Sequence, residues 1–346
     1  MRRVAVTGLG IVSPIGNSKS EVLSALMHQK SGIVYLPAMA ERNFKCCVYG
    51  AVREVQTRQI PRRTKQTMSN TAIYAAAAAL DAIKDARLTQ DAFRNDRTAV
   101  VLGTWLGGIN EVSKIEKVLR KHKSPSRAGG TAVVKLMNST ASGNLASLLG
   151  TKGRAYSVSS ACASGVDNIG HAYELIKYGL QDLCICGATE EESWAKVGVF
   201  FDNCGAMPTR WNRHPEKACR PFSKDREGFV MSEGAGVLIL EPLEDALARG
   251  ASVYAEIVGY GSANDGNNMF EPTGEGLKES IEQATAIARQ HSTQFAIDYI
   301  NSHGLGSKIG DAVEVRVFRE VFGSRSPLMS STKALTGHAM GATGAL

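Results

Sequence analysis

Apolar residues follow two alternating spacings along the chain. Short apolar runs are typical of buried strands, and segments in which apolar residues recur every three to four positions are typical of helices that bury one face. Strands are expected at Arg3–Thr7, Thr98–Gly103, Ala155–Ser159, Asp182–Gly187, Ala235–Glu241, Val253–Tyr260, Ile297–Asn301 and Leu328–Ser330. Helices are expected at Lys19–His28, Asn70–Ala86, Val134–Leu149, Gly165–Tyr178, Leu243–Arg249, Gly276–His291 and Asp311–Phe322. Strands that alternate with helices in this way predict a layered α/β architecture.

The length and hydrophobic content allow a large core. The chain has 346 residues, of which 43% are hydrophobic, so it can form one large domain or two fused halves. The turn at Arg249-Gly250 is the candidate boundary between such halves. No apolar run approaches the length of a membrane span. The apolar run that follows Met1 is too short for a signal peptide, and a first strand is expected there instead.

The net charge of +7 is concentrated in two basic clusters. One contains Arg58, Arg62, Arg63 and Lys65, and the other contains Lys114, Lys117, Arg120, Lys121, Lys123 and Arg127. Such clusters attract nucleic acid, anionic membranes or acidic proteins, and they also occur on ordinary solvated helices. Aromatic residues make up only 6% of the chain and do not interleave with the clusters, which argues against nucleic acid. An acidic protein partner and a plain solvated surface remain the alternatives.

Cys162 is the first candidate for chemistry. It lies in the segment Val158-Ser-Ser-Ala-Cys-Ala-Ser-Gly-Val166, between an expected buried strand and an expected helix. A thiol at a helix N-terminus meets unpaired N–H groups and a positive dipole, so we expect a lowered thiol pKa and a nucleophilic sulfur. The small residues around it leave room for a carbonyl group. These features indicate half of an acyl-transfer site, and a buried structural cysteine is the alternative.

The other cysteines are interpreted as structural and reduced. They are Cys46, Cys47, Cys184, Cys186, Cys204 and Cys219. The pair Cys184-Ile-Cys186 lies in an apolar run in which side chains two apart share one face of a strand. A metal pair is conceivable there, but no second Cys or His pair with ligand spacing accompanies it, so no metal site is expected.

Two histidines and a lysine occupy glycine-rich segments of the same kind. His303 follows the apolar run Tyr299-Ile-Asn, and the segment Ser330-Ser-Thr-Lys333-Ala-Leu-Thr-Gly-His338 places a lysine and a histidine among small residues. Lone histidines are usually structural. Because ligands bind at the strand ends of α/β sheets, we expect these groups to meet Cys162 in one site.

The chain resembles the β-ketoacyl-[acyl carrier protein] synthases, the condensing enzymes of fatty acid and polyketide synthesis. The resemblance rests on Val6-Thr-Gly-Leu-Gly-Ile-Val-Ser-Pro-Ile-Gly16, Ser160-Ala-Cys-Ala-Ser-Gly165, Arg220-Pro-Phe-Ser-Lys-Asp-Arg-Glu-Gly-Phe229, Asn301-Ser-His-Gly304 and Thr332-Lys-Ala-Leu-Thr-Gly-His338. The segments Glu190-Glu-Glu-Ser-Trp194 and Pro215-Glu-Lys-Ala218 resemble the synthase I branch of bacterial type II systems.

This resemblance implies a thiolase-like, layered α-β-α-β-α fold of two duplicated halves. Residues 1–250 would form the half with the cysteine, and residues 251–346 would form the half with the histidines. Relatives continue beyond the position of Leu346 with a glycine-rich Phe-Gly-Gly loop, so the C-terminal half is expected to be truncated.

The resemblance also implies the chemistry of each group. Cys162 would take an acyl group from a thioester, and His303 and His338 would stabilise the enolate that forms when a malonyl thioester loses CO2. Lys333 would tune these groups, with Glu314 and Asp311 in support. No metal or redox cofactor is implied, because the phosphopantetheine arm belongs to the acyl carrier protein.

Substrate and partner contacts are implied in the same way. The expected substrate-binding residues are Trp105, Gly107, Ile109, Leu305 and Ser307, and the expected carrier-protein docking residues are Arg62, Arg63, Lys65, Lys121 and Arg127. A cytoplasmic homodimer is also implied. The chain departs from the family pattern at His303-Gly-Leu305-Gly-Ser307, where relatives carry His-Gly-Thr-x-Thr. Leu305 cannot donate the threonine hydrogen bond to the arm.

Three alternatives remain open. A specialised polyketide or aryl-polyene ketosynthase would share Cys162, His303 and His338, and Leu305 favours it slightly. A non-catalytic partner resembling a chain-length factor is disfavoured by the presence of Cys162. A thiolase is disfavoured because the region of that family's second catalytic cysteine is absent.

Overall fold

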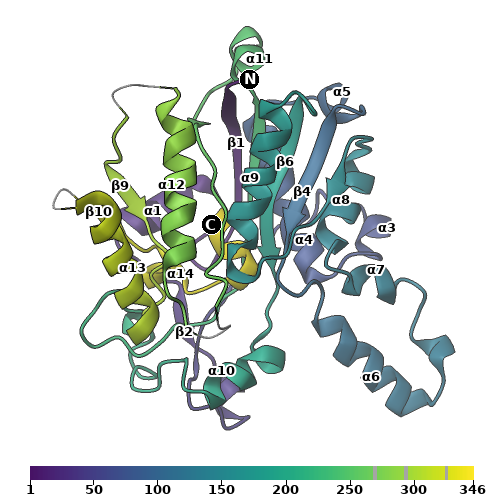
Figure 1. Ribbon diagram of the computed structural model, residues 1–346. Helices are drawn as coiled ribbons and strands as arrows, with labels where there is room; N and C mark the ends of the chain where they lie inside the picture. The colour runs from purple at the N-terminus through teal and green to yellow at the C-terminus, as the bar shows by residue number, and fades with distance from the viewer. Residues whose placement is uncertain (268–270, 292–294, 324–325) are drawn as a thin grey trace.

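A mixed sheet forms the centre of the molecule (Figure 1). The computed structural model describes residues 1–267, 271–291, 295–323 and 326–346. The sheet has six strands in the order β5-β4-β6-β7-β1-β8. Its members are β1 (Val4–Val12), β4 (Thr98–Gly103), β5 (Ala155–Tyr156), β6 (Leu183–Glu190), β7 (Gly234–Pro242) and β8 (Ala255–Ile257). Strand β4 pairs in parallel with β5 and β6, whereas β7 runs antiparallel to both β6 and β1.

Helices and two small sheets surround this centre. The longer helices are α1 (Lys19–Met27), α4 (Asn70–Asp85), α6 (Asn110–His122), α8 (Thr140–Leu149), α9 (Ser164–Lys177), α12 (Glu275–Arg289) and α13 (Lys308–Phe322). The shorter ones are α2 (Pro37–Ala40), α3 (Arg62–Lys65), α5 (Gln90–Phe93), α7 (Ala132–Leu136), α10 (Val199–Asn203), α11 (Leu243–Ala248) and α14 (Lys333–Thr336). The small sheets pair β2 (Ile33–Tyr35) with β3 (Val48–Gly50) and β9 (Tyr299–Asn301) with β10 (Leu328–Ser330).

Short 3-10 and π-helical segments are the remaining helical elements of the described residues. The 3-10 turns are η1 (Pro125–Arg127), η2 (Ala161–Ala163), η4 (Pro215–Lys217) and η6 (Met340–Ala345), and a π-helical turn, η3, spans Trp194–Gly198. Two of these turns matter for the site, because η2 carries Cys162 and η6 follows His338.

The two faces of the central sheet pack against different helices, because side chains alternate along a strand. On one face, Val100 and Ile185 belong to the hydrophobic core beneath α4 and α8. On the other face, Val101, Cys184 and Cys186 belong to the core beneath α9. Cys184 and Cys186 are fully buried there and act as apolar core residues, as predicted.

Helix α4 lies very close to β1. Its alanines 75–79 are buried, and they face glycines in the strand. A Cβ on Gly8 would lie 2.3 Å from the Ala82 carbonyl oxygen, and one on Gly10 would lie 1.8 Å from the Ala78 carbonyl oxygen. The short distance between helix and sheet therefore requires glycine on the strand.

The layered α/β prediction is confirmed, but several element boundaries were wrong. The helix expected at Val134–Leu149 is divided into α7 and α8 by an irregular turn at Met137, Asn138 and Ser139, where short polar side chains compete with helical hydrogen bonding. The buried strand expected before Cys162 is reduced to β5, which is partly exposed because it forms an edge of the sheet.

Other differences concern short or exposed elements. Strand β8 is shorter than the expected Val253–Tyr260, because only three residues pair with β1. Helix α6 was not predicted, although Val112, Ile115 and Leu119 have helical spacing. Strands β2 and β3 were also missed. Among the described residues, no helix is both long and apolar enough to span a membrane.

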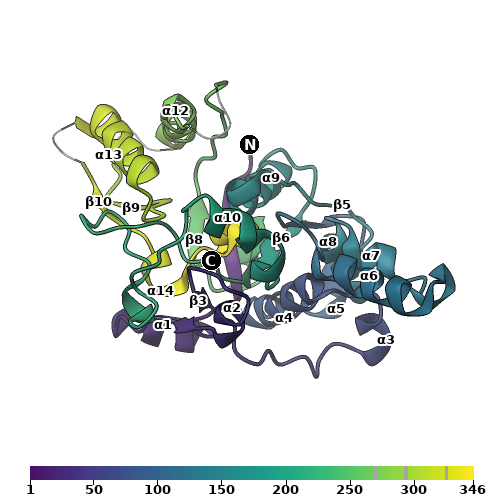
Figure 2. The same cartoon turned by 90° about the horizontal axis from the view of Figure 1, so that it is seen from below.

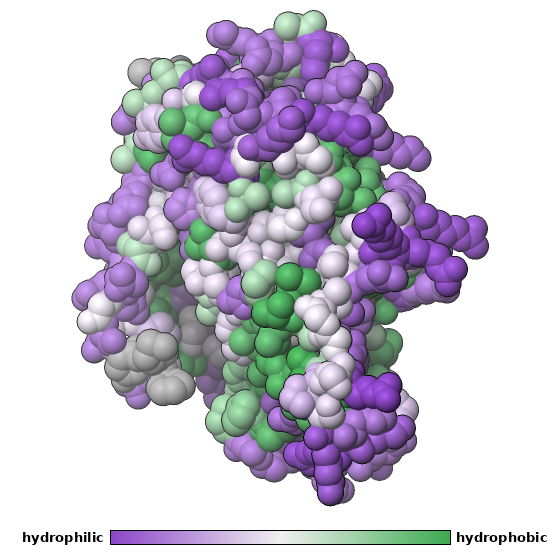
Figure 3. All heavy atoms as spheres, turned by 90° about the vertical axis from the view of Figure 1, so that its right-hand side faces the viewer, coloured by the Kyte–Doolittle hydropathy of each residue, from purple (hydrophilic) through white to green (hydrophobic). Residues whose placement is uncertain are grey.

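Apolar side chains gather on the face of the molecule formed by α6 and its neighbours (Figure 3). The apolar face of α6 is not covered by the central core, and α7 has no buried residue. Leu119, Val133 and Met137 in and after these helices are more than one-third exposed. Hydrophilic side chains frame this apolar area (Figure 3).

Candidate active site

A strained turn presents Cys162 just before α9. Ala161 has a φ of +52°, in the left-handed region that non-glycine residues rarely occupy. The Ser164 hydroxyl fastens the turn, since it accepts a hydrogen bond from the Ser160 N–H at 3.0 Å and donates one to the Ala161 carbonyl at 2.7 Å. The thiol therefore lies at the N-terminal end of a helix, as the sequence predicts.

Both predicted histidines meet this thiol. The His338 Nε2 lies 3.0 Å from the Cys162 Sγ, although the two residues are 176 positions apart. One ring nitrogen of each histidine and the sulfur lie within 4.8 Å of one another. The two imidazole rings are perpendicular, with centroids 5.5 Å apart. Cys162, His303 and His338 therefore form one cluster, as predicted.

His338 is held by backbone pairing and by one side chain. Its N–H donates to the Val230 carbonyl at 2.7 Å, and its carbonyl accepts from the Ser232 N–H at 2.9 Å. Its Nδ1 lies 2.8 Å from the Thr343 Oγ1. The expectation that His338 follows a strand was wrong, because the residue follows the short helix α14.

His303 follows β9 and is held by the first turns of α13. The Glu314 carboxylate accepts hydrogen bonds from the His303 N–H at 2.6 Å and the Gly304 N–H at 2.8 Å. Asp311 accepts from the Gly306 N–H at 3.0 Å and the Ser307 N–H at 3.1 Å. The two carboxylates thus shape the loop that carries His303.

Helix α13 begins earlier than the sequence predicts. Ser307 caps it, because its Oγ accepts from the Gly310 N–H at 3.0 Å. Asp311 lies one turn inside the helix and not at its start. Its carboxylate also accepts from the Phe222 N–H at 2.8 Å, which links the loop to the segment before β7.

Lys333 acts on this site through its charge. Its side chain is 4% exposed, and it makes no hydrogen bond or ion pair within the described part of the chain. Burial lowers the pKa of Lys333, and the negative charge of Glu314 opposes this effect.

The thiol does not have the lowered pKa that the helix N-terminus predicts. Burial raises the pKa of Cys162 to about 11, while the positive Lys333 acts in the opposite direction. This expectation was wrong because removal from water outweighs the favourable charges. The cysteine is therefore a thiol near neutral pH in the free site.

Both histidines are neutral near pH 7. Burial lowers the pKa of His338 well below its ordinary value, and the nearby His303 and Lys333 add to this effect. Removal from water and the charge of Lys333 also lower the pKa of His303, although its side chain keeps access to solvent. Neutral imidazoles can donate a hydrogen bond from Nε2–H to a developing oxyanion.

His303 lies at the wall of a cavity of about 780 Å³. Apolar side chains of Leu277, Leu305, Ile309 and Val313 contribute to its lining. Leu305 also packs against the core cluster around the segment before β7. Leu305 has no hydroxyl, whereas the Ser307 Oγ accepts the capping hydrogen bond from Gly310 N–H and keeps its O–H as a donor.

Trp105 connects to the histidines through a row of aromatic rings. Its ring lies 6.0 Å from that of Phe201, which lies 5.1 Å from Phe229, which in turn lies 5.4 Å from the His338 ring. Phe201 was not predicted, and its only sequence signal is an aromatic residue in a glycine-flanked segment.

Gly107 and Ile109 lie in the turn between β4 and α6. Gly107 has a φ of +63°, and a Cβ there would lie 2.6 Å from the Leu136 carbonyl oxygen. The backbone of this turn therefore packs closely on α7, which accounts for the glycine structurally.

Glu190 is a second residue that the sequence did not identify as part of the site. It is fully buried and accepts hydrogen bonds from the Trp105 N–H at 2.8 Å and the Thr104 hydroxyl at 3.2 Å. Burial raises the pKa of Glu190 to about 8, and these hydrogen bonds act in the opposite direction. The carboxyl thus joins the end of β6 to the turn after β4.

The expected docking residues lie away from the cavity. They belong to α3, α6 and η1, on the opposite side of the molecule from α12 and α13 (Figures 1 and 2). The two basic clusters therefore share one side of the chain.

The cluster of one thiol and two imidazoles has donors that suit Zn²⁺. Lys333, however, places a buried positive charge close enough to lower the pKa of both histidines. Such a charge repels a cation and attracts an anion, so the electrostatics favour a developing oxyanion over a metal ion.

Comparisons with known proteins agree along the whole chain. Residues 1–246 match the model of the β-ketoacyl synthase N-terminal domain, and residues 254–346 match the model of the β-ketoacyl synthase C-terminal domain. The 3-oxoacyl-[acyl-carrier-protein] synthase 1 of Haemophilus influenzae is 43% identical over 345 residues, which cover 100% of this chain and 84% of the relative. The synthase 1 of Escherichia coli K12 is 40% identical, with 99% of this chain and 84% of the relative covered.

Solved structures show the same likeness. A β-ketoacyl synthase from Burkholderia phymatum has a TM-score of 0.92 and 34% identity, covering 100% of this chain and 84% of that one. A type II polyketide synthase acyl-carrier protein in complex with its ketosynthase has a TM-score of 0.85 and 30% identity, covering 99% of this chain and 84% of that one.

Proposed function

The chain belongs to the β-ketoacyl synthase family, and on this premise we propose that Cys162, His303 and His338 catalyse its condensation reaction. The enzyme is an acyltransferase that joins an acyl thioester to malonyl carrier protein, with loss of CO2, in fatty acid elongation. The contact between the Cys162 Sγ and the His338 Nε2, with His303 beside them, carries the assignment of roles.

The first step is acyl transfer. The Cys162 sulfur attacks the thioester carbonyl, and its proton passes to the His338 Nε2 and then to the departing thiolate of the donor. The new thioester bond forms as the old one breaks. Because the thiol pKa is raised to about 11, this proton transfer must accompany the attack.

The second step is decarboxylation and carbon–carbon bond formation. The malonyl carboxylate leaves as CO2, and its electron pair forms a thioester enolate whose oxygen accepts hydrogen bonds from the neutral imidazoles of His303 and His338. The enolate carbon then attacks the acyl group on Cys162. The carbon–sulfur bond breaks, and the released thiolate takes up a proton from water.

The supporting groups act on geometry and charge. Glu314 and Asp311 hold the loop that carries His303, and Lys333 favours the negative charge that develops near it. We assign no metal or redox cofactor, because no step needs one and the charge of Lys333 disfavours a cation.

Mass spectrometry tests this function. The protein is incubated with acyl carrier protein thioesters of several chain lengths, and Cys162→Ala serves as the matched control. We expect one acyl group on the native protein and none on the variant, with condensation reduced at least about a thousandfold. Absence of acylation on the native protein would contradict the proposal.

The carrier protein is proposed to dock on the basic side formed by α3, α6 and η1. Acidic carrier surfaces complement these helices. Charge reversal at Arg62 and Lys121 should raise KM for the carrier-linked substrate about tenfold with little change in kcat, because rim charges act mainly on encounter. Arg289→Glu, on α12, is the control. Equal effects of all three variants would argue against docking at this side.

A homodimer is proposed to form through the apolar side chains of α6 and α7. Leu119, Val133 and Met137 would be removed from water by a second copy. Sedimentation of the native protein and of Val133→Glu tests this, with a dimer expected only for the native protein. A cytoplasmic location is proposed on the function of the relatives alone.

A polyketide ketosynthase is the second candidate. Leu305, which gives the cavity an apolar wall, favours an unusual substrate, and the ketosynthase in complex with a carrier protein is 30% identical. The higher identity to synthase 1 favours fatty acid elongation. Saturated and polyunsaturated acyl thioesters in the same acylation assay distinguish the two.

A further inference from the structure

Thr343 is placed to act on His338 from the side opposite Cys162. The His338 side chain is 1% exposed, so each ring nitrogen depends on a protein partner. The Nε2 lies 3.0 Å from the Cys162 Sγ, and the Nδ1 lies 2.8 Å from the Thr343 Oγ1. Within the described ranges of the chain, Nδ1 has no other hydrogen-bond partner.

We propose that Thr343 is a positioning residue that lets His338 accept a proton in acyl transfer and donate a hydrogen bond in decarboxylation. This inference rests on the proposed function. A hydroxyl can both donate and accept a hydrogen bond, whereas a backbone N–H can only donate. The partner of Nδ1 therefore decides which protonation states of the imidazole are tolerated.

The two steps demand opposite roles from Nδ1. When the Cys162 proton moves to Nε2, the imidazolium carries N–H on both nitrogens, and Nδ1–H donates to the Thr343 Oγ1. Between the two steps the neutral ring changes tautomer, as its Nδ1 proton is released to water and water supplies a proton to Nε2. When the ring then donates from Nε2–H to the enolate oxygen, Nδ1 accepts from the Thr343 O–H. Rotation of a single hydroxyl serves both states.

The imidazolium has little other support. Burial and the positive charge of Lys333 both disfavour a second proton on His338. A hydrogen bond from Nδ1–H to the Thr343 Oγ1 stabilises this short-lived cation on the side away from the sulfur. The acyl-transfer step should therefore depend on the hydroxyl more strongly than the decarboxylation step.

The turn that carries Thr343 is wedged between the central sheet and α9. A Cβ on Gly236 would lie 1.9 Å from the Ala345 carbonyl oxygen, and a Cβ on Gly165 would lie 2.7 Å from the Ala345 N. A Cβ on Gly341 would lie 2.5 Å from the Trp105 N and 2.9 Å from the Glu190 Oε2. This close packing fixes η6, so Thr343 is held at one place relative to the imidazole.

Three variants test the inference. Thr343→Val keeps the shape and removes the hydroxyl, Thr343→Ser keeps the hydroxyl, and Thr89→Val is the control at an exposed position without a capping hydrogen bond. Acylation of Cys162 is followed by mass spectrometry at several pH values, and CO2 release from malonyl carrier protein is measured separately. The thermal midpoint of each variant reports folding.

We expect Thr343→Val to slow acylation at pH 7 about tenfold to a hundredfold and to alter its pH dependence, with a smaller effect on CO2 release. Thr343→Ser should lie within about threefold of the native rate, and Thr89→Val should equal it. The His338 ¹⁵N resonances should show the neutral tautomer protonated on Nδ1 in the native free protein. In Thr343→Val they should shift towards the tautomer protonated on Nε2, because a buried Nδ1–H would lack an acceptor.

Equal acylation rates for Thr343→Val and the native protein would overturn the inference, and so would a Thr343→Ser variant as slow as Thr343→Val. Unchanged ¹⁵N resonances in a folded Thr343→Val variant would do the same. Failure of the native protein itself to acylate would contradict the proposed function instead, so the two failures are distinguishable.

Discussion

Lys333 is the residue whose charge most directly affects the nucleophile. It stabilises the Cys162 thiolate without a hydrogen bond, because the two groups share a site with little water. Burial nevertheless keeps the thiol pKa above its ordinary value. The balance between these two effects sets how readily the sulfur reacts at a given pH.

Replacement of Lys333 by Met should shift that balance. The positive charge of Lys333 opposes the rise of the Cys162 pKa to about 11, so its loss should raise this pKa further. Less thiolate would then be present, and alkylation by iodoacetamide at pH 9 should slow several-fold. The rate of alkylation as a function of pH measures this. Lys84→Met, at an exposed position of α4, should leave the profile unchanged, and an equal profile for Lys333→Met would contradict the role of the charge.

Glu314 is expected to govern the position of His303. In Glu314→Gln, the amide NH₂ would face a backbone N–H, which leaves one buried donor without a partner and costs about 1–3 kcal/mol. If the loop then moves, CO2 release should fall about tenfold or more. Glu320→Gln, on the exposed side of the same helix, is the control. Equal CO2 release by both variants would refute the role of Glu314.

At the scale of elements, the site depends on turns from three separate places in the chain. Cys162 comes from η2 before α9, His303 from the loop between β9 and α13, and His338 from the turn between α14 and η6. Each turn is local, and its sequence signal is a cluster of small residues. Their approach depends on how closely the helices pack on the sheet.

The contact between α4 and β1 is expected to be intolerant of added volume. A methyl group on Gly10 would overlap the Ala78 carbonyl, so Gly10→Ala should lower the free energy of unfolding by about 1–3 kcal/mol. Urea denaturation measures this. Gly143→Ala in α8, where a Cβ meets no atom within 4 Å, should be neutral or stabilising. A stable Gly10→Ala variant would contradict the packing argument.

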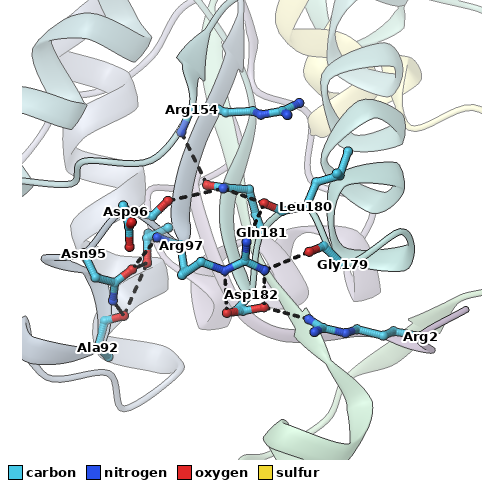
Figure 4. Close-up of polar contacts among 11 residues, drawn as sticks. Arg2, Ala92, Asn95, Asp96, Arg97, Arg154, Gly179, Leu180, Gln181 and Asp182 are labelled. Carbon is cyan, nitrogen blue, oxygen red and sulfur yellow. Dashed lines mark hydrogen bonds and ion pairs between the residues drawn. The ribbon is translucent and has the colours of Figure 1, made fainter.

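At the scale of the whole molecule, one charge cluster connects the N-terminal ends of three strands of the central sheet (Figure 4). Asp182 bonds to Arg97 at 2.8 and 2.9 Å and to Arg2 at 2.6 Å. These residues precede β6, β4 and β1 in turn. Hydrogen bonds from Arg97, followed by those from Arg2, lower the pKa of Asp182 to about 2.

This cluster should make stability depend on acid pH. Because the folded pKa lies below the unfolded one, the carboxylate stabilises the protein above about pH 4, and this contribution is lost as the pH falls towards 2. Solvent screens the pair, since Asp182 and Arg2 are 42% and 44% exposed, so the contribution is at most about 1 kcal/mol.

Asp182→Asn should therefore lower the free energy of unfolding at pH 7 by less than about 1 kcal/mol, and the difference should vanish near pH 2. Urea denaturation at both pH values measures it, with Asp298→Asn at an exposed position as the control. A difference that persists at pH 2 would exclude the ionic explanation.

The division into halves at residues 250 and 251 stays a prediction. So do the roles of Trp105, Gly107 and Ile109 in substrate binding, since no substrate contact tests them. The single helix expected at Val134–Leu149 shows what apolar spacing alone cannot predict. The spacing continues without a break, but tertiary packing and the polar pair Asn138-Ser139 end one helix and begin another there.

The sequence by itself determined the layered α/β class, because apolar spacing is a local signal that short segments carry without their neighbours. Its motifs also identified the family through their resemblance to known members, and that resemblance pointed to Cys162, His303, His338 and Lys333 as the proposed reacting groups. Only the tertiary structure decided that Nε2 of His338 faces the sulfur, that Thr343 holds Nδ1 and that Glu190 lies beneath the site. It also reversed the expected thiol pKa. The reason is that both results depend on how distant segments pack together. Cys162 and His338 are 176 positions apart, and the Cys162 thiol loses water only when those segments pack around it, which no local sequence pattern specifies.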